Sequence, residues 1–220
     1  MNMMRFTTMK TKLRKYPSIF LILLLAISSC FLTGCVNQHP KDSKKSSQGE
    51  SVETMLEITD PKEKQAVLNA KAKVKALSGN PRIVATSPAV ADICDKLDLD
   101  LVGVPKSSVS KIPSRYKKVK KVGLAMSPDM EIVSSLNPDW ILAPSSLETD
   151  LKPKFEELKN TEYAFLNLRS VQGMYRSVQE LGEIFGKQQE AEKMTKEFTT
   201  FYKSYTKRNK NKKHPKVLVL

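Results

Sequence analysis

The 220-residue sequence contains few side chains that could carry covalent or metal chemistry, with three cysteines and two histidines. It also has no Gly-x-Ser-x-Gly, no His-Glu-x-x-His and no glycine-rich phosphate loop, which are signatures of serine hydrolases, zinc peptidases and nucleotide-binding enzymes. His39 lies in a polar segment and His214 near the end of the sequence, so neither is placed like a catalytic base. We therefore expect a protein that is not an enzyme.

No apolar run is long enough for a permanent transmembrane helix. Residues 19–32 are apolar, but a spanning helix needs about 20 such residues. This run follows the basic segment 10–15, which gives the three-part layout of a signal peptide. It ends in Leu32-Thr33-Gly34-Cys35, which resembles a lipobox, where small residues admit a peptidase and the cysteine thiol accepts lipid.

We predict that residues 1–34 are a lipoprotein signal peptide and that Cys35 carries S-diacylglycerol and N-palmitoyl groups. Two or more acyl chains anchor a protein stably, whereas one chain binds only marginally. The expected location is the extracytoplasmic face of the cell membrane. The alternative is an ordinary signal peptide followed by a chance cysteine.

The cysteines do not supply a disulfide framework. Cys30 leaves with the predicted signal peptide and Cys35 is consumed by lipid, so Cys94 is left alone. Cys94 belongs to an amphipathic helical stretch, which favours a small buried hydrophobic residue over a reactive thiol. Stability must then come from packing.

Charge of one sign is in excess, because the net charge is +14. Five cations and no acid lie in residues 1–34, which leaves +9 on the remainder. This balance suits an anionic surface or ligand. Nucleic acid is not an expected partner of an exported chain without a nucleic-acid-binding motif. Residues 35–58 have little apolar content, and we predict a lipidated flexible tether.

From residue 59 to 168, short apolar strands alternate with helices. A surface helix at 61–78 is predicted from Asp60 as N-cap, Pro61 at the first position and Glu63 completing a capping box. The predicted strands are 82–86, 101–104, 121–123, 140–143 and 163–168, and the predicted helices between them are 89–97, one opening at Pro128, and 151–158. This order predicts an α/β lobe with a mainly parallel sheet and helices on both faces.

Residues 169–213 read as a helical region. Met174, Val178, Leu181 and Phe185 keep a helical period, and a second helix from Lys187 to Arg208 would run roughly 30 Å. Residues 214–220 read as a buried strand with nothing after it. We expect the Rossmann-like N-terminal lobe of a two-lobe substrate-binding protein, a connecting helix, and the first strand of a truncated C-terminal lobe.

Several segments resemble a known family. The order of elements from Pro81 onward is similar to that of the periplasmic-binding-protein lipoproteins of iron-siderophore, vitamin B12 and haem ABC importers. Some stretches resemble, more narrowly, the haem-receptor lipoproteins of iron-regulated surface determinant systems. These stretches are 82–86, 95–99, 102–105, 112–117, 122–128, 173–174, 181–182 and 213–218.

The resemblance implies a receptor that binds haem b as cargo and performs no chemistry of its own. Its implied partners are haem, an ABC permease in the membrane, and cell-wall haem-donor proteins. A siderophore receptor of the same architecture is the nearest alternative, but such receptors use Arg, Tyr and Trp clusters, and Trp140, the single tryptophan, lies in a predicted strand. A structural or adhesive lipoprotein is a further alternative.

Ligands of open α/β sheets bind at the carboxyl ends of the strands, which selects the loops 86–89, 105–108 and 124–127. Met126 is the sharpest candidate, since a thioether is a suitable axial ligand for haem iron, and by resemblance it matches the family's axial methionine. The alternative is a packing methionine, as expected for Met130 one turn later.

Four other residues match haem contacts by resemblance: Pro88, Ala89, Ser107 and Ser108. Small or apolar residues suit the porphyrin face, and serines can donate to a propionate. The family often has an aromatic residue where Ser108 stands.

Two features bear on affinity. The resemblance implies a second axial ligand, a histidine of the C-terminal lobe, and neither histidine here fits, so binding by the chain as written should be weak. The stretch from Lys106 to Lys121 has seven cations and no acid. It could steer propionates, form a solvated face, or attract an anionic cell wall.

Overall fold

A computed structural model describes residues 56–58 and 60–212. The predicted signal peptide, Cys35, His39 and the predicted strand at 214–220 with His214 lie outside the described residues. Within the described part, no helix has the length and apolarity that a bilayer crossing requires.

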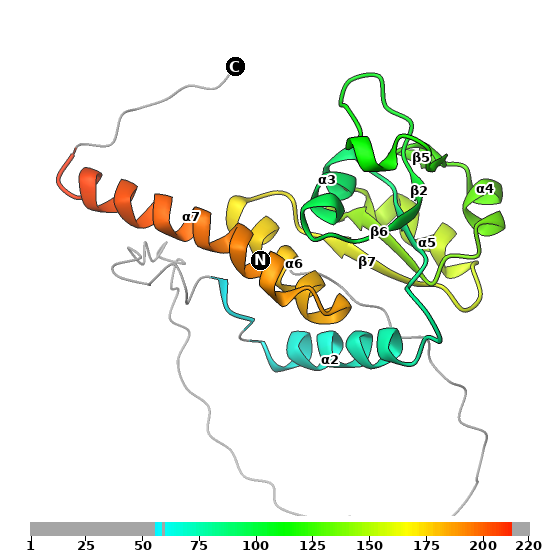
Figure 1. Cartoon of the computed structure of the whole chain (residues 1–220), viewed down its shortest axis with the longest axis horizontal. Helices are drawn as coiled ribbons and strands as arrows, with labels where there is room; N and C mark the ends of the chain where they lie inside the picture. Colours follow the sequence, from blue (N-terminus) through cyan, green and yellow to red (C-terminus); the bar gives the residue numbers. More distant parts are fainter. Residues whose placement is uncertain (1–55, 59, 213–220) are drawn as a thin grey trace, which may run out of the picture. The chain divides into compact units, whose positions relative to one another are not determined.

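The described core is one parallel sheet (Figure 1). The order of its strands is β3 (Lys120–Lys121), β2 (Leu101–Val104), β1 (Ile83–Ala85), β6 (Trp140–Pro144) and β7 (Glu162–Leu166). The two outermost described strands are β3 and β7. Every neighbouring pair is parallel. The predicted α/β class and parallel sheet are confirmed.

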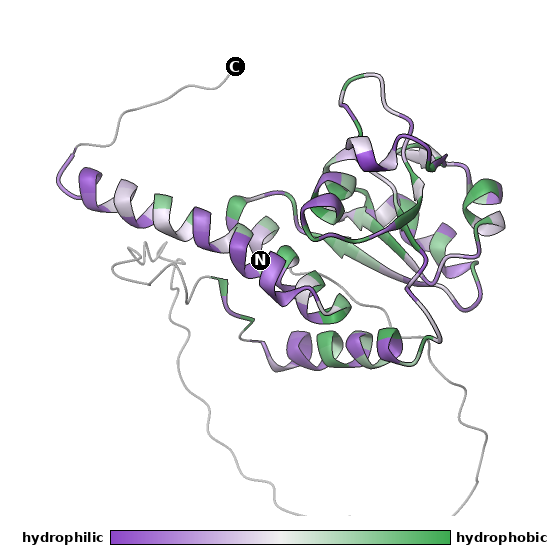
Figure 2. Ribbon diagram, in the orientation of Figure 1, coloured by the Kyte–Doolittle hydropathy of each residue, from purple (hydrophilic) through white to green (hydrophobic). Residues whose placement is uncertain are grey.

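Both faces of the sheet are buried, because successive strand side chains point to opposite sides. In β6, Trp140 and Leu142 join one apolar cluster, while Ile141 and Ala143 join the other. The first cluster is covered by α2 (Pro61–Lys75), α3 (Pro88–Lys96) and α6 (Val171–Phe185), and the second by α4 (Met130–Ser135) and α5 (Glu148–Glu156). Figure 2 shows that the strands are mainly hydrophobic, whereas hydrophilic and hydrophobic residues alternate along α2.

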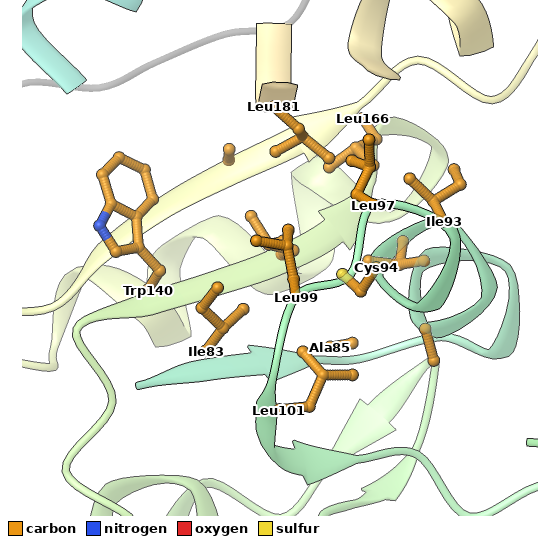
Figure 3. Packing of buried hydrophobic residues seen from close by; sticks show 14 of the residues in the cluster. Ile83, Ala85, Ile93, Cys94, Leu97, Leu99, Leu101, Trp140, Leu166 and Leu181 are labelled. Carbon is orange, nitrogen blue, oxygen red and sulfur yellow. The ribbon is translucent and has the colours of Figure 1, made fainter. Parts of the chain in front are cut away.

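Cys94 lies in the first cluster with Ile93, Leu97 and Leu99 (Figure 3). Its side chain is fully buried. Burial raises the pKa of the Cys94 thiol to about 12, so the group stays neutral and poorly nucleophilic. The prediction of a small buried hydrophobic residue is confirmed.

The start of α2 differs from the prediction in one respect. Asp60 caps the helix, its carboxylate accepting from the Lys62 N–H at 2.8 Å, as expected. Glu63 does not complete a capping box, because its buried carboxylate accepts from Arg176 on α6 at 2.9 Å. The Glu63 carboxylate thus forms an ion pair with Arg176 across the α2–α6 interface and not a capping hydrogen bond within α2.

The region after β2 holds a second difference. The predicted strand at 121–123 is β3 at Lys120–Lys121, and an antiparallel pair follows it, β4 (Gly123–Leu124) with β5 (Ser127–Pro128). Pro128 therefore lies in β5 and does not open a helix. Helix α4 begins at Met130, because the Asp129 carboxylate accepts from the N–H groups of Glu131 and Ile132.

Helices α6 and α7 (Gln188–Asn209) match the predicted helical region. They meet at Gly186, whose φ of 70° lies in the left-handed region that favours glycine. Ala191 and Thr195 near the start of α7 are buried, whereas Phe201 and Tyr205 near its end are exposed.

Candidate ligand-binding edge

The three predicted ligand loops lie at one edge of the sheet, called here the carboxyl edge. They follow β1, β2 and β3, which are neighbours and parallel, so their carboxyl ends meet. Backbone hydrogen bonds join two of the loops: the Val122 N–H donates to Val104 (2.9 Å), and the Lys106 N–H donates to Gly123 (2.7 Å). The loop after β2 is thus held against the β4–β5 hairpin.

Met126 lies in the turn of this hairpin, between Leu124 and Ser127. Its side chain is 73% exposed, and that of Leu124 is 58% exposed. Met130 is only partly buried and packs against the second apolar cluster. The two methionines therefore differ in exposure, and the Met126 side chain is accessible from solvent. Whether it binds iron stays a prediction.

The first loop joins β1 to α3. The Ser87 Oγ caps α3 by accepting from the Val90 N–H at 3.3 Å, and Thr86 turns inward to donate to the Leu142 carbonyl. Pro88 and Ala89, the first residues of the helix, are half-buried and exposed respectively. The position is compatible with small apolar contacts to a flat ligand.

The second loop contains both predicted serines. Ser107 is half-buried and its Oγ accepts from the Ser110 N–H at 3.0 Å, whereas Ser108 is exposed. Ser107 shapes the loop as a local turn. Its hydroxyl proton is still available to a ligand acceptor, because that bond uses only a lone pair.

The loop after β6 also lies at the carboxyl edge, but none of its residues was predicted from the sequence to be a ligand contact. Ser145 follows β6, and its Oγ is buried without a hydrogen-bond partner among the described residues. A serine directly after a buried apolar strand was the only available signal. Val109, in the loop after β2, is 95% exposed, and no periodic pattern marks it in the sequence.

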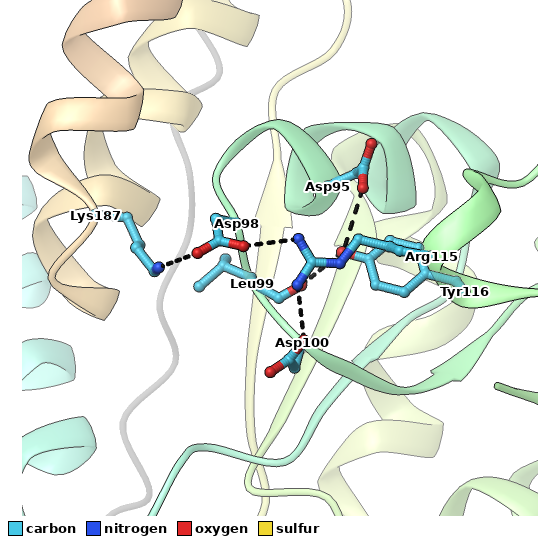
Figure 4. Close-up of polar contacts among 7 residues, drawn as sticks. All are labelled: Asp95, Asp98, Leu99, Asp100, Arg115, Tyr116 and Lys187. Carbon is cyan, nitrogen blue, oxygen red and sulfur yellow. Dashed lines mark hydrogen bonds and ion pairs between the residues drawn. The ribbon is translucent and has the colours of Figure 1, made fainter.

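The predicted basic stretch divides into two parts. Arg115 cannot steer a ligand at the carboxyl edge, because it pairs with Asp98 (2.9 Å) and Asp100 (2.7 Å), at the point where the chain enters β2. This is the opposite edge of the sheet, called here the amino edge (Figure 4). The remaining six cations of the stretch are lysines, and all are exposed.

The Asp98 carboxylate also accepts from Lys187 at 2.8 Å, which ties the α6–α7 corner to the loop before β2. The hydrogen bonds from Lys187 and Arg115 lower the pKa of Asp98. Trp140 lies at the same edge, buried in an edge-to-face contact with Phe185 at 5.5 Å. It is therefore not placed to serve a ligand at the carboxyl edge.

An open groove of about 530 Å³ lies elsewhere, between α3, α6 and α7. Its lining mixes apolar side chains with charged ones of both signs, including Ile93, Lys96, Met174, Met194 and Glu197. None of the predicted haem contacts lines it. Chemistry and topology favour the carboxyl edge as the candidate site, because the exposed thioether and the strand ends are there.

Comparisons with known proteins agree with this geometry. Residues 83–220 match the model of the periplasmic binding protein family. The chain is 37% identical over 144 residues to the high-affinity heme uptake system protein IsdE of Staphylococcus aureus. The aligned region covers 65% of this chain and 49% of that protein. The chain thus spans about half the length of the curated relatives it matches.

Solved structures give the same result. A substrate-binding protein of an ABC transporter from Listeria monocytogenes superposes with a TM-score of 0.59 at 42% identity, over 62% of this chain and 52% of that one. IsdE of S. aureus complexed with heme gives 0.58 at 33% identity, over 62% and 53%. The siderophore binding protein BauB gives 0.52 at 23% identity, over 62% and 51%, a likeness of fold alone. This chain belongs to the periplasmic binding protein family.

Proposed function

We propose that this chain is a haem-binding receptor lipoprotein that delivers haem to an ABC importer. The observation that carries the proposal is the exposed thioether of Met126 in a hairpin held at the carboxyl edge. The similarity to IsdE, a heme uptake protein, supports the choice of cargo. Haem b is the proposed cargo, with Met126 as one axial ligand of its iron.

Four residues complete the proposed contact set: Pro88, Ala89, Ser107 and Ser108. The first two would lie against the porphyrin face, and the serine hydroxyls would donate to propionate oxygens. The exposed Leu124 beside Met126 adds apolar surface that suits a flat hydrophobic ring.

The remaining parts of the proposal concern location and partners. Lipid on Cys35 would hold the chain on the extracytoplasmic face of the membrane, near the permease. Cell-wall haem-donor proteins would load it. No catalytic role is proposed, because delivery requires only binding and release. Acylation of Cys35 is tested by mass spectrometry of the membrane fraction, where a Cys35→Ser chain should lack the lipid.

The cargo is tested by titrating ferrous and ferric haem into the chain and into Met126→Ala. We expect the substitution to weaken binding at least tenfold, most strongly for ferrous haem, because soft thioethers favour the reduced iron. The Soret band should also shift as the axial ligand is lost.

Met130→Ala is the matched control, since Met130 lies two residues beyond β5 and packs against the core. It should cost stability but leave the Soret band in place. Identical spectra and affinities for the parent chain and Met126→Ala would contradict the axial role. Failure of the parent chain to bind haem, together with saturable binding of a ferric siderophore, would favour the alternative cargo.

A further inference from the structure

Four lysines form a rim at one end of the sheet, called here the lysine rim: Lys117, Lys118, Lys120 and Lys121. All four are exposed, and the last two form β3, an outermost strand that pairs only with β2 in the part of the sheet that the structure describes. The first two lead into it from a single 3₁₀ turn (Ser114–Tyr116). A compact block of like charge therefore lies along an open sheet edge.

The rim is held rigidly by the residues between its lysines. Tyr116 is buried, with its hydroxyl donating to the Leu99 carbonyl at 2.5 Å. Val119 packs against the first apolar cluster and Val122 is fully buried in the second. These three anchors recur every third residue, so the lysines between them are presented to solvent on a fixed backbone.

Some other basic side chains of the lobe are neutralised by acids. Arg115, Lys187 and Lys71 each pair with a carboxylate. Among the described residues, none of the four rim lysines forms an ion pair, and no acid occurs in the sequence between Asp100 and Asp129. Lysines on an edge strand also discourage sheet-to-sheet association. That role does not require the pair of lysines that precedes the strand.

We propose that the lysine rim docks the lobe on the anionic headgroups of the membrane surface. Charge complementarity supports this partner, because a polybasic segment near an anionic leaflet gains about fivefold in partitioning for each lysine. The inference rests on the proposed anchoring at Cys35. Leu56 follows that cysteine by 21 residues, so even a fully extended connection keeps the lobe within about 75 Å of the bilayer.

The test measures binding of the unacylated chain from residue 36 onward to vesicles by sedimentation. We expect binding to phosphatidylglycerol vesicles, loss of binding in high salt, and no binding to phosphatidylcholine vesicles. Replacing all four rim lysines by glutamine should weaken binding at least a hundredfold. Replacing them by arginine should retain it. Because lipid is absent from this chain, the result does not depend on whether Cys35 is acylated.

A matched control removes the same charge elsewhere, through glutamine at four exposed lysines: Lys62, Lys64, Lys96 and Lys159. It should weaken binding less than threefold. If the fourfold rim variant aggregates, Lys117→Gln with Lys118→Gln leaves the strand untouched and should still weaken binding about 25-fold. Equal losses in rim and control variants would overturn the proposal, since net charge alone would then act. Stronger binding to soluble poly(glycerol phosphate) than to vesicles would overturn it in favour of a wall polymer.

Discussion

The two edges of the sheet are built from opposite kinds of surface. At the amino edge, polar side chains are paired, as in Asp98 between Arg115 and Lys187, and the large Trp140 is buried. At the carboxyl edge, the apolar side chains of Leu124 and Met126 are exposed. The paired and buried side chains indicate that the amino edge contributes to the stability of the lobe, whereas the exposed side chains of the carboxyl edge are accessible from solvent.

Trp140→Ala should produce the largest loss of stability. The side chain is buried against Phe185, and such truncations cost about 3–5 kcal/mol. Leu124→Ala at the other edge should change the free energy of unfolding by no more than about 0.5 kcal/mol, because the side chain is largely exposed. Urea unfolding followed by circular dichroism measures both. Similar losses for the two variants would remove the distinction between the edges.

The buried acid Glu180 belongs to neither edge and should dominate the pH dependence of stability. Burial, followed by its contact with Glu63, raises the pKa of Glu180 to about 9. The stabilisation from neutral Glu180 is complete below the unfolded pKa near 4.5, and it is lost as pH rises through the folded value. Glu180→Gln should therefore flatten the decline in unfolding free energy between about pH 5 and pH 9.

Melting temperatures of the parent chain and Glu180→Gln, measured across that pH range, provide the test. Glu183→Gln is a suitable comparison, since Glu183 lies one turn along on α6 and is partly exposed. Hydrogen bonds from Lys71 and Gln188 lower the pKa of Glu183, so its contribution has the opposite sign. Parallel curves for the parent chain and Glu180→Gln would contradict the assignment.

Arg115→Ala should have a smaller effect on stability than Trp140→Ala or Glu180→Gln. Its partners Asp98 and Asp100 are well exposed, and ion pairs of this kind contribute on the order of 1 kcal/mol or less. The loss should shrink as salt is added. Lys118→Ala, three residues away and unpaired within the described structure, should be close to neutral. A salt-independent loss would mean that Arg115 acts through packing on Tyr116 rather than through charge.

Much of the sheet could be predicted because β1, β2 and β6 are continuous apolar runs buried on both faces. The Asp60 cap also followed from local chemistry. The ion pair of Glu63 could not be predicted in this way, because its partner Arg176 lies 113 residues away in the sequence. The β4–β5 pair was missed because Val122-Gly123 reads as the end of one strand, whereas β4 begins at Gly123, which adopts a φ of 94°.

The candidate site was predictable only in part. Topology and a family resemblance selected Met126 and the serine loop, and the structure places them at one edge. Arg115 could not be recognised as a paired residue from the basic stretch alone. Its acidic partners precede β2 and lie outside that stretch. The exposure of Leu124 and Val109 depends on how the loops turn, which periodicity does not encode.

Asp129 connects the base of the β4–β5 hairpin to α4. Its N–H donates to the Val122 carbonyl at 2.8 Å, and its carboxylate caps the first turn of α4 through Glu131 and Ile132. A cargo bound to the Met126 sulfur would therefore act on the hydrogen bonds of Asp129. The rate of amide hydrogen exchange at the start of α4 would then report whether the carboxyl edge is occupied.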